Sequence, residues 1–232
     1  MAAIRDNFYV YGKFYNYCDG DEIIQECRSH LYIIRKSNLV PGEDVEKANQ
    51  DVNVLMMNPG TSRPLHENEE INEVQLPLSN RKAGNVPIIE ANPDNTQSRI
   101  MSIMNEMGWN RATVINLSDV RDNSKTNSTG RKAWQQIKSF EKQFEGKPYK
   151  KDHSIFSENR NEELSSVLNK NVPLIIAWGC YKGMNSLKQI AHSYLEGESL
   201  NYYCVKSKSS DLSYYHPLYS GWKSGILEVL RK

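Results

Sequence analysis

Four short apolar runs restrict the folds open to this chain more than any other feature. They lie at residues 51–58, 111–117, 172–178 and 200–205, and each ends in a polar or glycine-containing turn. Runs this short and this apolar predict buried strands, and stretches with helical spacing separate them. Strands that alternate with helices favour a parallel sheet covered on both faces. We therefore predict a three-layer α/β/α domain whose central sheet is mainly parallel and four-stranded.

The remaining segments complete the expected domain. Residues 1–50 are rich in aromatic side chains and predict short strands around a polar turn, which we interpret as an N-terminal strand extension packed on the core. Residues 59–94 show no periodicity and contain five prolines, and so long an irregular stretch is usually functional or disordered. At 232 residues the chain suits a single domain, 1–232, in which 59–94 is a long loop on the substrate side.

Composition argues against several classes of protein. No apolar run approaches the roughly 20 residues of a membrane span, and residues 1–11 lack the layout of a signal peptide, so we expect a cytoplasmic protein without a membrane partner. The cysteines at 18, 27, 180 and 204 include no close pair, and their spacing matches neither a zinc site nor an iron–sulfur cluster. We predict no disulfide, no metal and no cofactor.

Charge is distributed unevenly although the net charge is only +1. Residues 121–151 carry nine basic and three acidic side chains, a balance of +6, whereas residues 42–75 carry two basic and eight acidic ones, a balance of −6. The basic stretch is consistent with a phosphate-binding surface. A solvated, partly helical surface is the alternative interpretation, and charge alone favours it.

Four motifs lie at the ends of the predicted strands or near the C-terminus. They are M-M-N-P-G-T at 56–61, T-V-I-N-L at 113–117, L-I-I-A-W-G-C-Y at 174–181 and H-P-L-Y-S at 216–220. In this order they resemble the uracil-DNA glycosylase superfamily, and the N-P-G turn is most similar to that of its mismatch-specific thymine/uracil branch. The combination of N-P-G-T, A-W-G and H-P-L-Y also resembles a bacterial and phage family of unknown function. The resemblance runs from about residue 51 to the C-terminus.

The resemblance implies a role for each motif. Asn58 would hold the attacking water, Asn116 would read the base edge, and His216 would stabilise the departing base. The other residues expected to bind substrate are Met57, Pro59, Gly60, Thr61 and Gly179. The residues expected to contact DNA are Arg121, Leu218, Tyr219, Ser220 and Lys223. Where the uracil-specific enzymes have a tyrosine that blocks bulky bases, this chain has Gly60, which implies a larger base.

The function that these motifs predict is that of a DNA glycosylase. It would hydrolyse the N-glycosidic bond of a modified or mismatched base flipped out of double- or single-stranded DNA, without an obligate protein partner. Defence against phage DNA with modified bases is one role that fits the second resemblance. Two alternatives stay open: a non-catalytic module that binds nucleic acid or nucleotides, and a hydrolase of free nucleosides or nucleotides.

Structural interpretations of single residues also stay open. Asn58 can be a turn-capping residue, Asn116 can make a structural hydrogen bond at a strand end, and Trp178 is better interpreted as core than as a stacking platform. Cys180 lacks an evident base and is not expected to be a nucleophile. The histidines without partners at metal or triad spacing are interpreted as ordinary: His30, His66, His153 and His192.

Overall fold

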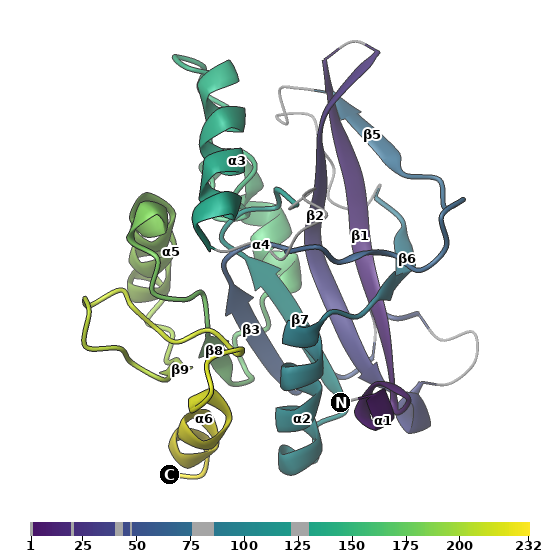
Figure 1. The fold of residues 1–232 in the computed structure, drawn as a ribbon, viewed down its shortest axis with the longest axis vertical. Helices are drawn as coiled ribbons and strands as arrows, with labels where there is room; N and C mark the ends of the chain where they lie inside the picture. Colours follow the sequence, from purple (N-terminus) through teal and green to yellow (C-terminus); the bar gives the residue numbers. More distant parts are fainter. Residues whose placement is uncertain (1, 20, 40–43, 47, 76–85, 122–129) are drawn as a thin grey trace.

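The computed structural model describes the whole chain except residues 1, 20, 40–43, 47, 76–85 and 122–129. Its strands join in the order β4-β6-β1-β2-β7-β3-β8-β9, and β5 pairs with β1 (Figure 1). The strands are β1 (Phe8–Asp19), β2 (Glu22–Arg35), β3 (Val52–Met56), β4 (Arg63–Pro64), β5 (Asn72–Gln75), β6 (Ile88–Asn92), β7 (Arg111–Asn116), β8 (Leu174–Ile176) and β9 (Tyr203–Cys204). The α-helices are α1 (Ala2–Arg5), α2 (Asn95–Met107), α3 (Gly130–Gln143), α4 (Asn161–Val167), α5 (Asn185–Gly197) and α6 (Trp222–Leu230). Short 3-10 helices span Lys36–Asn38, Glu158–Arg160 and Lys182–Met184.

The predicted fold class, a central four-stranded and mainly parallel sheet, was wrong. The described residues form a nine-stranded mixed sheet in which antiparallel ladders join more residues than parallel ones. The four predicted apolar runs do form parallel neighbours, in the order β7-β3-β8-β9, but they make up only one side of that sheet.

The N-terminal residues account for the difference. β1 and β2 are 12 and 14 residues long, pair as an antiparallel hairpin, and continue the sheet because β2 pairs antiparallel with β7. Residues 1–50 therefore contribute two central strands rather than an extension. Strand propensity is visible in their aromatic side chains, but the edge at which a strand joins a sheet depends on non-local hydrogen bonds.

The predicted loop 59–94 also contains strands in its described parts. β4 and β6 pair with each other, β6 pairs antiparallel with β1, and β5 pairs parallel with β1. Their lengths, two, four and five residues, are too short to produce a recognisable alternation of polar and apolar side chains. Residues 76–85 lie outside the described part of the chain.

Two hydrophobic cores lie on opposite faces of the sheet. Neighbouring strand residues point to opposite faces, so Leu55 and Ile115 join one core whereas Val54 and Val114 join the other. The first core includes side chains of α3, α4 and α5, namely Ile137, Phe140, Leu164, Leu187 and Ala191. The second includes side chains of α2 and α6, namely Ile100, Met104, Trp222 and Ile226. Each fully buried aliphatic side chain contributes roughly 1.5–3 kcal/mol, so both helical layers are held to the sheet.

The start of α2 matters for the cleft described below. Asp94 is the N-cap: its carboxylate accepts a hydrogen bond from the backbone N–H of Gln97, and the Gln97 side chain accepts one from the backbone N–H of Asp94. The helix ends at Gly108, whose φ of 69° is favourable for glycine. The reciprocal cap fixes the direction of the Asp94 side chain.

Candidate active site

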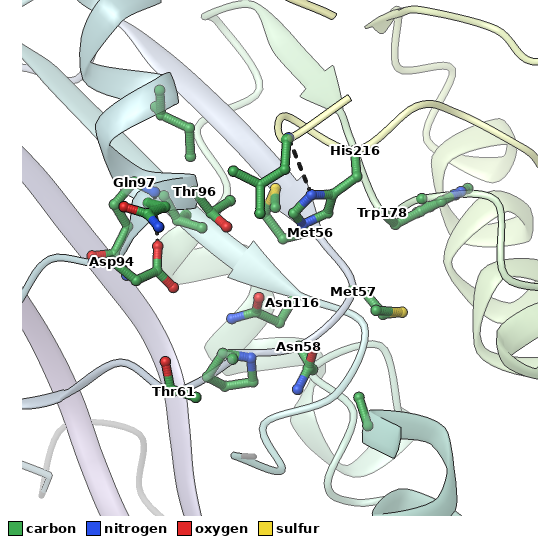
Figure 2. A pocket seen from close by; sticks show the side chains of 18 of the residues that line it. Met56, Met57, Asn58, Thr61, Asp94, Thr96, Gln97, Asn116, Trp178 and His216 are labelled. Carbon is green, nitrogen blue, oxygen red and sulfur yellow. Dashed lines mark hydrogen bonds between the residues drawn. The ribbon is translucent and has the colours of Figure 1, made fainter. Parts of the chain in front are cut away.

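The carboxyl ends of β3, β7 and β8 open into one cleft with a volume of about 530 Å³ (Figure 2). The parallel strands end at the same edge of the sheet, which explains why residues far apart in the sequence meet there. The predicted site residues that line the cleft are Met57, Asn58, Pro59, Gly60, Thr61, Asn116, Gly179, His216 and Leu218. Arg121, Tyr219, Ser220 and Lys223 are not among its lining residues.

Asn116 is the last residue of β7 and is completely buried. Neither its Nδ2 nor its Oδ1 has a hydrogen-bond partner among the described residues. A buried amide left in this state costs about 1–3 kcal/mol for each unsatisfied group. The alternative interpretation of Asn116, a structural hydrogen bond at the strand end, therefore has no counterpart in the described part of the chain. The amide offers a donor and an acceptor beside the cleft.

Asn58 lies in the turn that follows β3. Its Nδ2 donates a hydrogen bond to the backbone oxygen of Val120 at 3.4 Å, which fixes the orientation of the amide. Figure 2 shows its oxygen on the side facing Asn116 and His216. The turn continues through Gly60, whose φ of 62° lies in the left-handed region, and a Cβ there would lie 3.4 Å from Oδ2 of Asp94. The turn conformation thus favours glycine and leaves this side of the cleft open.

His216 lines the cleft as a neutral hydrogen-bond donor. Burial lowers its pKa from 6.5 to about 4, and the nearby negative charge of Asp94 opposes this shift only in part. Its Nδ1 accepts the backbone N–H of Leu218 at 3.3 Å, so the proton of the neutral ring resides on Nε2. A neutral imidazole with an N–H donor can stabilise negative charge without first being protonated.

The turn after β8 brings Gly179 against His216. Gly179 has a φ of 84°, and a Cβ there would lie 3.8 Å from the Cβ of His216. The fully buried Lys188 of α5 holds this turn, because its Nζ donates to the backbone oxygens of Gly179 at 2.8 Å and Tyr181 at 3.1 Å. Burial lowers the pKa of Lys188 to about 8. Trp178 is fully buried in the first core, and it also borders the cleft.

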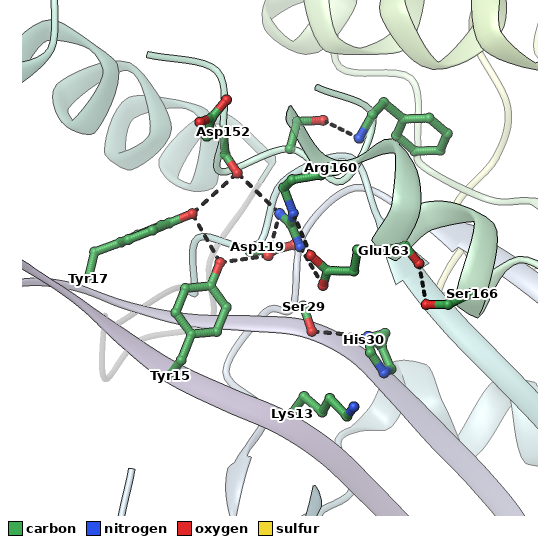
Figure 3. A network of polar contacts seen from close by, with 12 residues as sticks. Lys13, Tyr15, Tyr17, Ser29, His30, Asp119, Asp152, Arg160, Glu163 and Ser166 are labelled. Atoms are coloured by element: carbon green, nitrogen blue, oxygen red, sulfur yellow. Dashed lines mark hydrogen bonds and ion pairs between the residues drawn. The ribbon is translucent and has the colours of Figure 1, made fainter. Parts of the chain in front are cut away.

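A polar network supports the loop after β7 (Figure 3). This loop contains Val120, whose backbone oxygen accepts the hydrogen bond from Asn58. Asp119, the neighbour of Val120, forms a buried ion pair with Arg160 at 2.7 Å and accepts a hydrogen bond from the Tyr15 hydroxyl at 2.6 Å. A buried ion pair of this kind is strongly destabilising to break, because the remaining charge loses its partner. The network therefore holds the acceptor that orients Asn58.

A Ser–His–Glu chain lies in the same region. Ser118 Oγ is 2.9 Å from Nδ1 of His153, and Nε2 of that ring is 2.9 Å from a carboxylate oxygen of Glu141. The order of these three side chains resembles that of a hydrolase triad. The sequence analysis found no partner for His153 at triad spacing. However, Ser118 is completely buried and does not line the cleft, so a substrate could not reach its hydroxyl. The chain of hydrogen bonds supports the loop.

Two charged residues in the cleft were missed by the sequence analysis. Asp94 is the one carboxylate and Arg28 the one guanidinium among the lining residues of the described structure. The D-N-T-Q sequence at 94–97 resembles a helix N-cap, which locates Asp94 at a helix start but not in a cleft. Arg28 lies inside the long strand β2, and no sequence motif marks it.

The residues expected to contact DNA phosphates already have partners. Arg121 forms an ion pair with Glu26 at 2.5 Å, and its Nε donates to the backbone oxygen of Ser62 at 2.8 Å. Lys223 forms an ion pair with Glu106 at 3.1 Å. In the basic stretch 121–151, residues 122–129 lie outside the described part of the chain. Ser220 is exposed, as a surface contact requires.

The two bulky residues expected to contact DNA, Leu218 and Tyr219, are exposed. Leu218 is 51% exposed and lines the cleft, whereas Tyr219 is 47% exposed and lies outside it. The Tyr219 ring stacks on Tyr215 with centroids 3.9 Å apart and planes 7° from parallel. Large exposed hydrophobic side chains beside a cleft are typical of a contact surface.

The described residues contain no cluster of three or more His, Cys, Asp or Glu side chains that could hold a metal ion. None of the helices in the described ranges is long and apolar enough to cross a membrane. Comparison of the chain with protein-family models, with curated proteins and with solved structures gave no match.

Proposed function

We propose that this protein is a DNA glycosylase that hydrolyses the N-glycosidic bond of a modified or mismatched base larger than uracil. One observation carries the proposal: Asn58, Asn116 and His216, from three separate segments, line one cleft in which the buried Asn116 amide has no hydrogen-bond partner in the described structure. A buried amide with a free donor and a free acceptor is suited to the edge of a base. The cleft volume of about 530 Å³ falls in the range of small-molecule sites.

In the proposed reaction, water adds to C1′ of the sugar, the bond from C1′ to the base nitrogen breaks, and its electron pair leaves with the base. His216 donates its Nε2–H to the base as negative charge develops there, which stabilises the transition state more than the ground state. Asn58 orients the water through its amide oxygen. The base takes up a proton from solvent after it departs.

Asp94 supplies the negative charge that this mechanism requires and that the neutral amide of Asn58 cannot provide. The sugar becomes positively charged in an oxocarbenium-like transition state, and a carboxylate in the cleft stabilises that charge. The water loses a proton as it adds to C1′, and Asp94 is the carboxylate available to accept it. We assign this role to Asp94 because it is the one acidic side chain lining the cleft in the described structure.

Hydrolysis of free nucleotides is the second candidate, and a specific observation favours it. Arg121 and Lys223, which were expected to hold DNA phosphates, are engaged by Glu26 and Glu106. Exposed ion pairs are weak, about 0–1 kcal/mol, so DNA phosphates could still compete for Lys223. A mononucleotide requires no such surface, because it needs contacts only within the cleft.

The test is release of free base under single-turnover conditions from duplex DNA, single-stranded DNA and mononucleotides carrying a panel of modified bases. Asn116→Ala and His216→Ala should each slow release by about 10²- to 10³-fold. Asn161→Ala and His192→Ala, at residues that do not line the cleft, are the matched controls and should keep the wild-type rate. Absence of base release from every substrate would contradict the proposal, and release from mononucleotides alone would select the second candidate.

A further inference from the structure

Arg28 is a buried cation on the sheet side of the cleft. It lies on β2 opposite Phe14, is 2% exposed, and is one of the lining residues. Its Nε and Nη1 have no hydrogen-bond partner, and it forms no ion pair, among the described residues. Arginine is almost never fully buried unless it is paired, so an unpaired guanidinium beside a cleft requires an explanation.

Two carboxylates attract this charge, but neither forms an ion pair with the guanidinium. Oδ1 of Asp94 accepts the backbone N–H of Gln97 at the start of α2, and Asp119 is bound by Arg160 at 2.7 Å. Burial lowers the pKa of Arg28 to about 10, the attraction of Asp94 opposes the shift, and the positive charge of Arg121 adds to it. The side chain nevertheless remains a cation at neutral pH.

We propose that Arg28 forms an oxyanion subsite within the cleft, which binds a carboxylate or phosphate oxygen of the same ligand whose base contacts Asn116. The planar guanidinium matches two oxygens of such a group, and hydrogen bonds between opposite charges are the strong ones. A neutral acceptor would satisfy the N–H groups but would leave the buried charge without a directly paired anion. The ligand therefore carries a negative charge on the side of the cleft that faces β2.

Two sources share this chemistry: the phosphate of a nucleotide, and an acidic substituent on the base itself. The placement of the base at Asn116 rests on the proposed function, but the preference for an anion does not require catalysis. It can be measured with compounds that the protein leaves intact, so failure of the subsite and failure of the glycosylase proposal are distinguishable.

The experiment compares equilibrium binding of matched pairs by isothermal titration calorimetry. One pair is uracil and 5-carboxyuracil, which differ by a carboxylate on the base, and the other is deoxyuridine and deoxyuridine 5′-monophosphate. In at least one pair the anion should bind the wild-type protein at least about tenfold more tightly, as expected for a charge-assisted contact. Preference within the first pair identifies the base substituent as the source, and preference within the second identifies the phosphate.

Arg28→Gln should abolish the preference while changing the affinity for the neutral member by less than about twofold, because the base contacts remain. Arg35→Gln, on the same strand but outside the cleft, is the matched control and should keep the preference. Equal affinities within both pairs in the wild-type protein, or a preference that survives in Arg28→Gln, would overturn the subsite.

Arg28→Met provides a second test if the glutamine variant folds poorly. Removing an unpaired buried charge together with its polar groups should leave the melting temperature unchanged or raise it. The preferred anion should then raise the melting temperature of the wild-type protein but not that of Arg28→Met. A shift of the same size in both proteins would place the anion elsewhere.

Discussion

The protonation of His216 provides the sharpest test of the cleft geometry, because it can be measured without knowing the substrate. The imidazole has a pKa of about 4 in the folded protein and 6.5 as a free side chain. As the pH falls from 6.5 to 4, the unfolded chain binds a proton that the folded protein does not bind. The free energy of unfolding therefore decreases over this window, and the loss is complete below pH 4.

The magnitude follows from the two pKa values. Between pH 7 and pH 5 the difference in proton binding lowers the free energy of unfolding by about 2 kcal/mol. This is an upper limit, because the ring is only partly buried and solvent reduces the shift. At pH 5 only about a tenth of the folded molecules carry a protonated ring, so the part of base release that depends on His216 should be nearly constant from pH 8 to pH 5.

The assay is chemical denaturation of the wild-type protein and His216→Asn at pH 7 and pH 5. The asparagine retains an acceptor for the backbone N–H of Leu218 but does not titrate, so the variant should lose up to about 2 kcal/mol less than the wild type on acidification. Other titrating groups cancel in the difference. NMR titration of the imidazole nitrogens measures the pKa directly. Equal losses in the two proteins, or a titration midpoint near 6.5, would refute the reasoning.

Four further predictions concern the cleft and the charged surface. Asp94→Asn keeps an N-cap residue and removes the carboxylate, so base release should slow by about 10²-fold while the free energy of unfolding changes by less than about 0.5 kcal/mol. A lower stability with an unchanged rate would show that Asp94 has a purely structural role. Burial lowers the pKa of Lys188 to about 8, so the free energy of unfolding of the wild type, relative to that of Lys188→Met, should rise between pH 8 and pH 10.5 in denaturation experiments. If this relative rise is absent, the amine titrates normally. Gly60→Ala should cost about 1–2 kcal/mol in thermal denaturation because its φ is 62°, and an unchanged melting temperature would show that the turn relaxes. Charge reversal at Lys132 and Lys138 should weaken nucleic-acid binding. It should also lower the slope of log affinity against log salt concentration by about one unit for each phosphate that the variant no longer neutralises. Unchanged binding would identify a solvated surface.

The sequence alone identified the elements that build the cleft. The runs at 51–58 and 111–117 are apolar enough to be buried and too short to be helices, and they form β3 and β7. Parallel strands end at the same edge of a sheet, so the asparagines at the ends of these runs belong at one edge, and both line the cleft. Local composition and the order of the elements were sufficient for that inference.

The extent of the sheet depended on tertiary structure. The strands in residues 8–35 were recognisable, but the register of β2 against β7 depends on hydrogen bonds between residues about 80 positions apart, such as Leu31 with Val114. No local pattern specifies such a partner. The prediction therefore stopped at four parallel strands, whereas the folded chain joins nine strands in its described part.

The charges in the cleft were likewise determined only by the fold. Asn58, Asn116 and His216 stand in short motifs, and the resemblance of those motifs to a known family suggested a role for each. Arg28 and Asp94 stand in no such motif, and they reach the cleft because β2 lies beside β7 and because α2 begins next to the Gly60 turn. Whether a charged side chain lies in water or beside a cleft depends on the residues that surround it in the folded chain. Strand pairing and helix packing bring those residues together from distant parts of the sequence, so no local pattern reveals them.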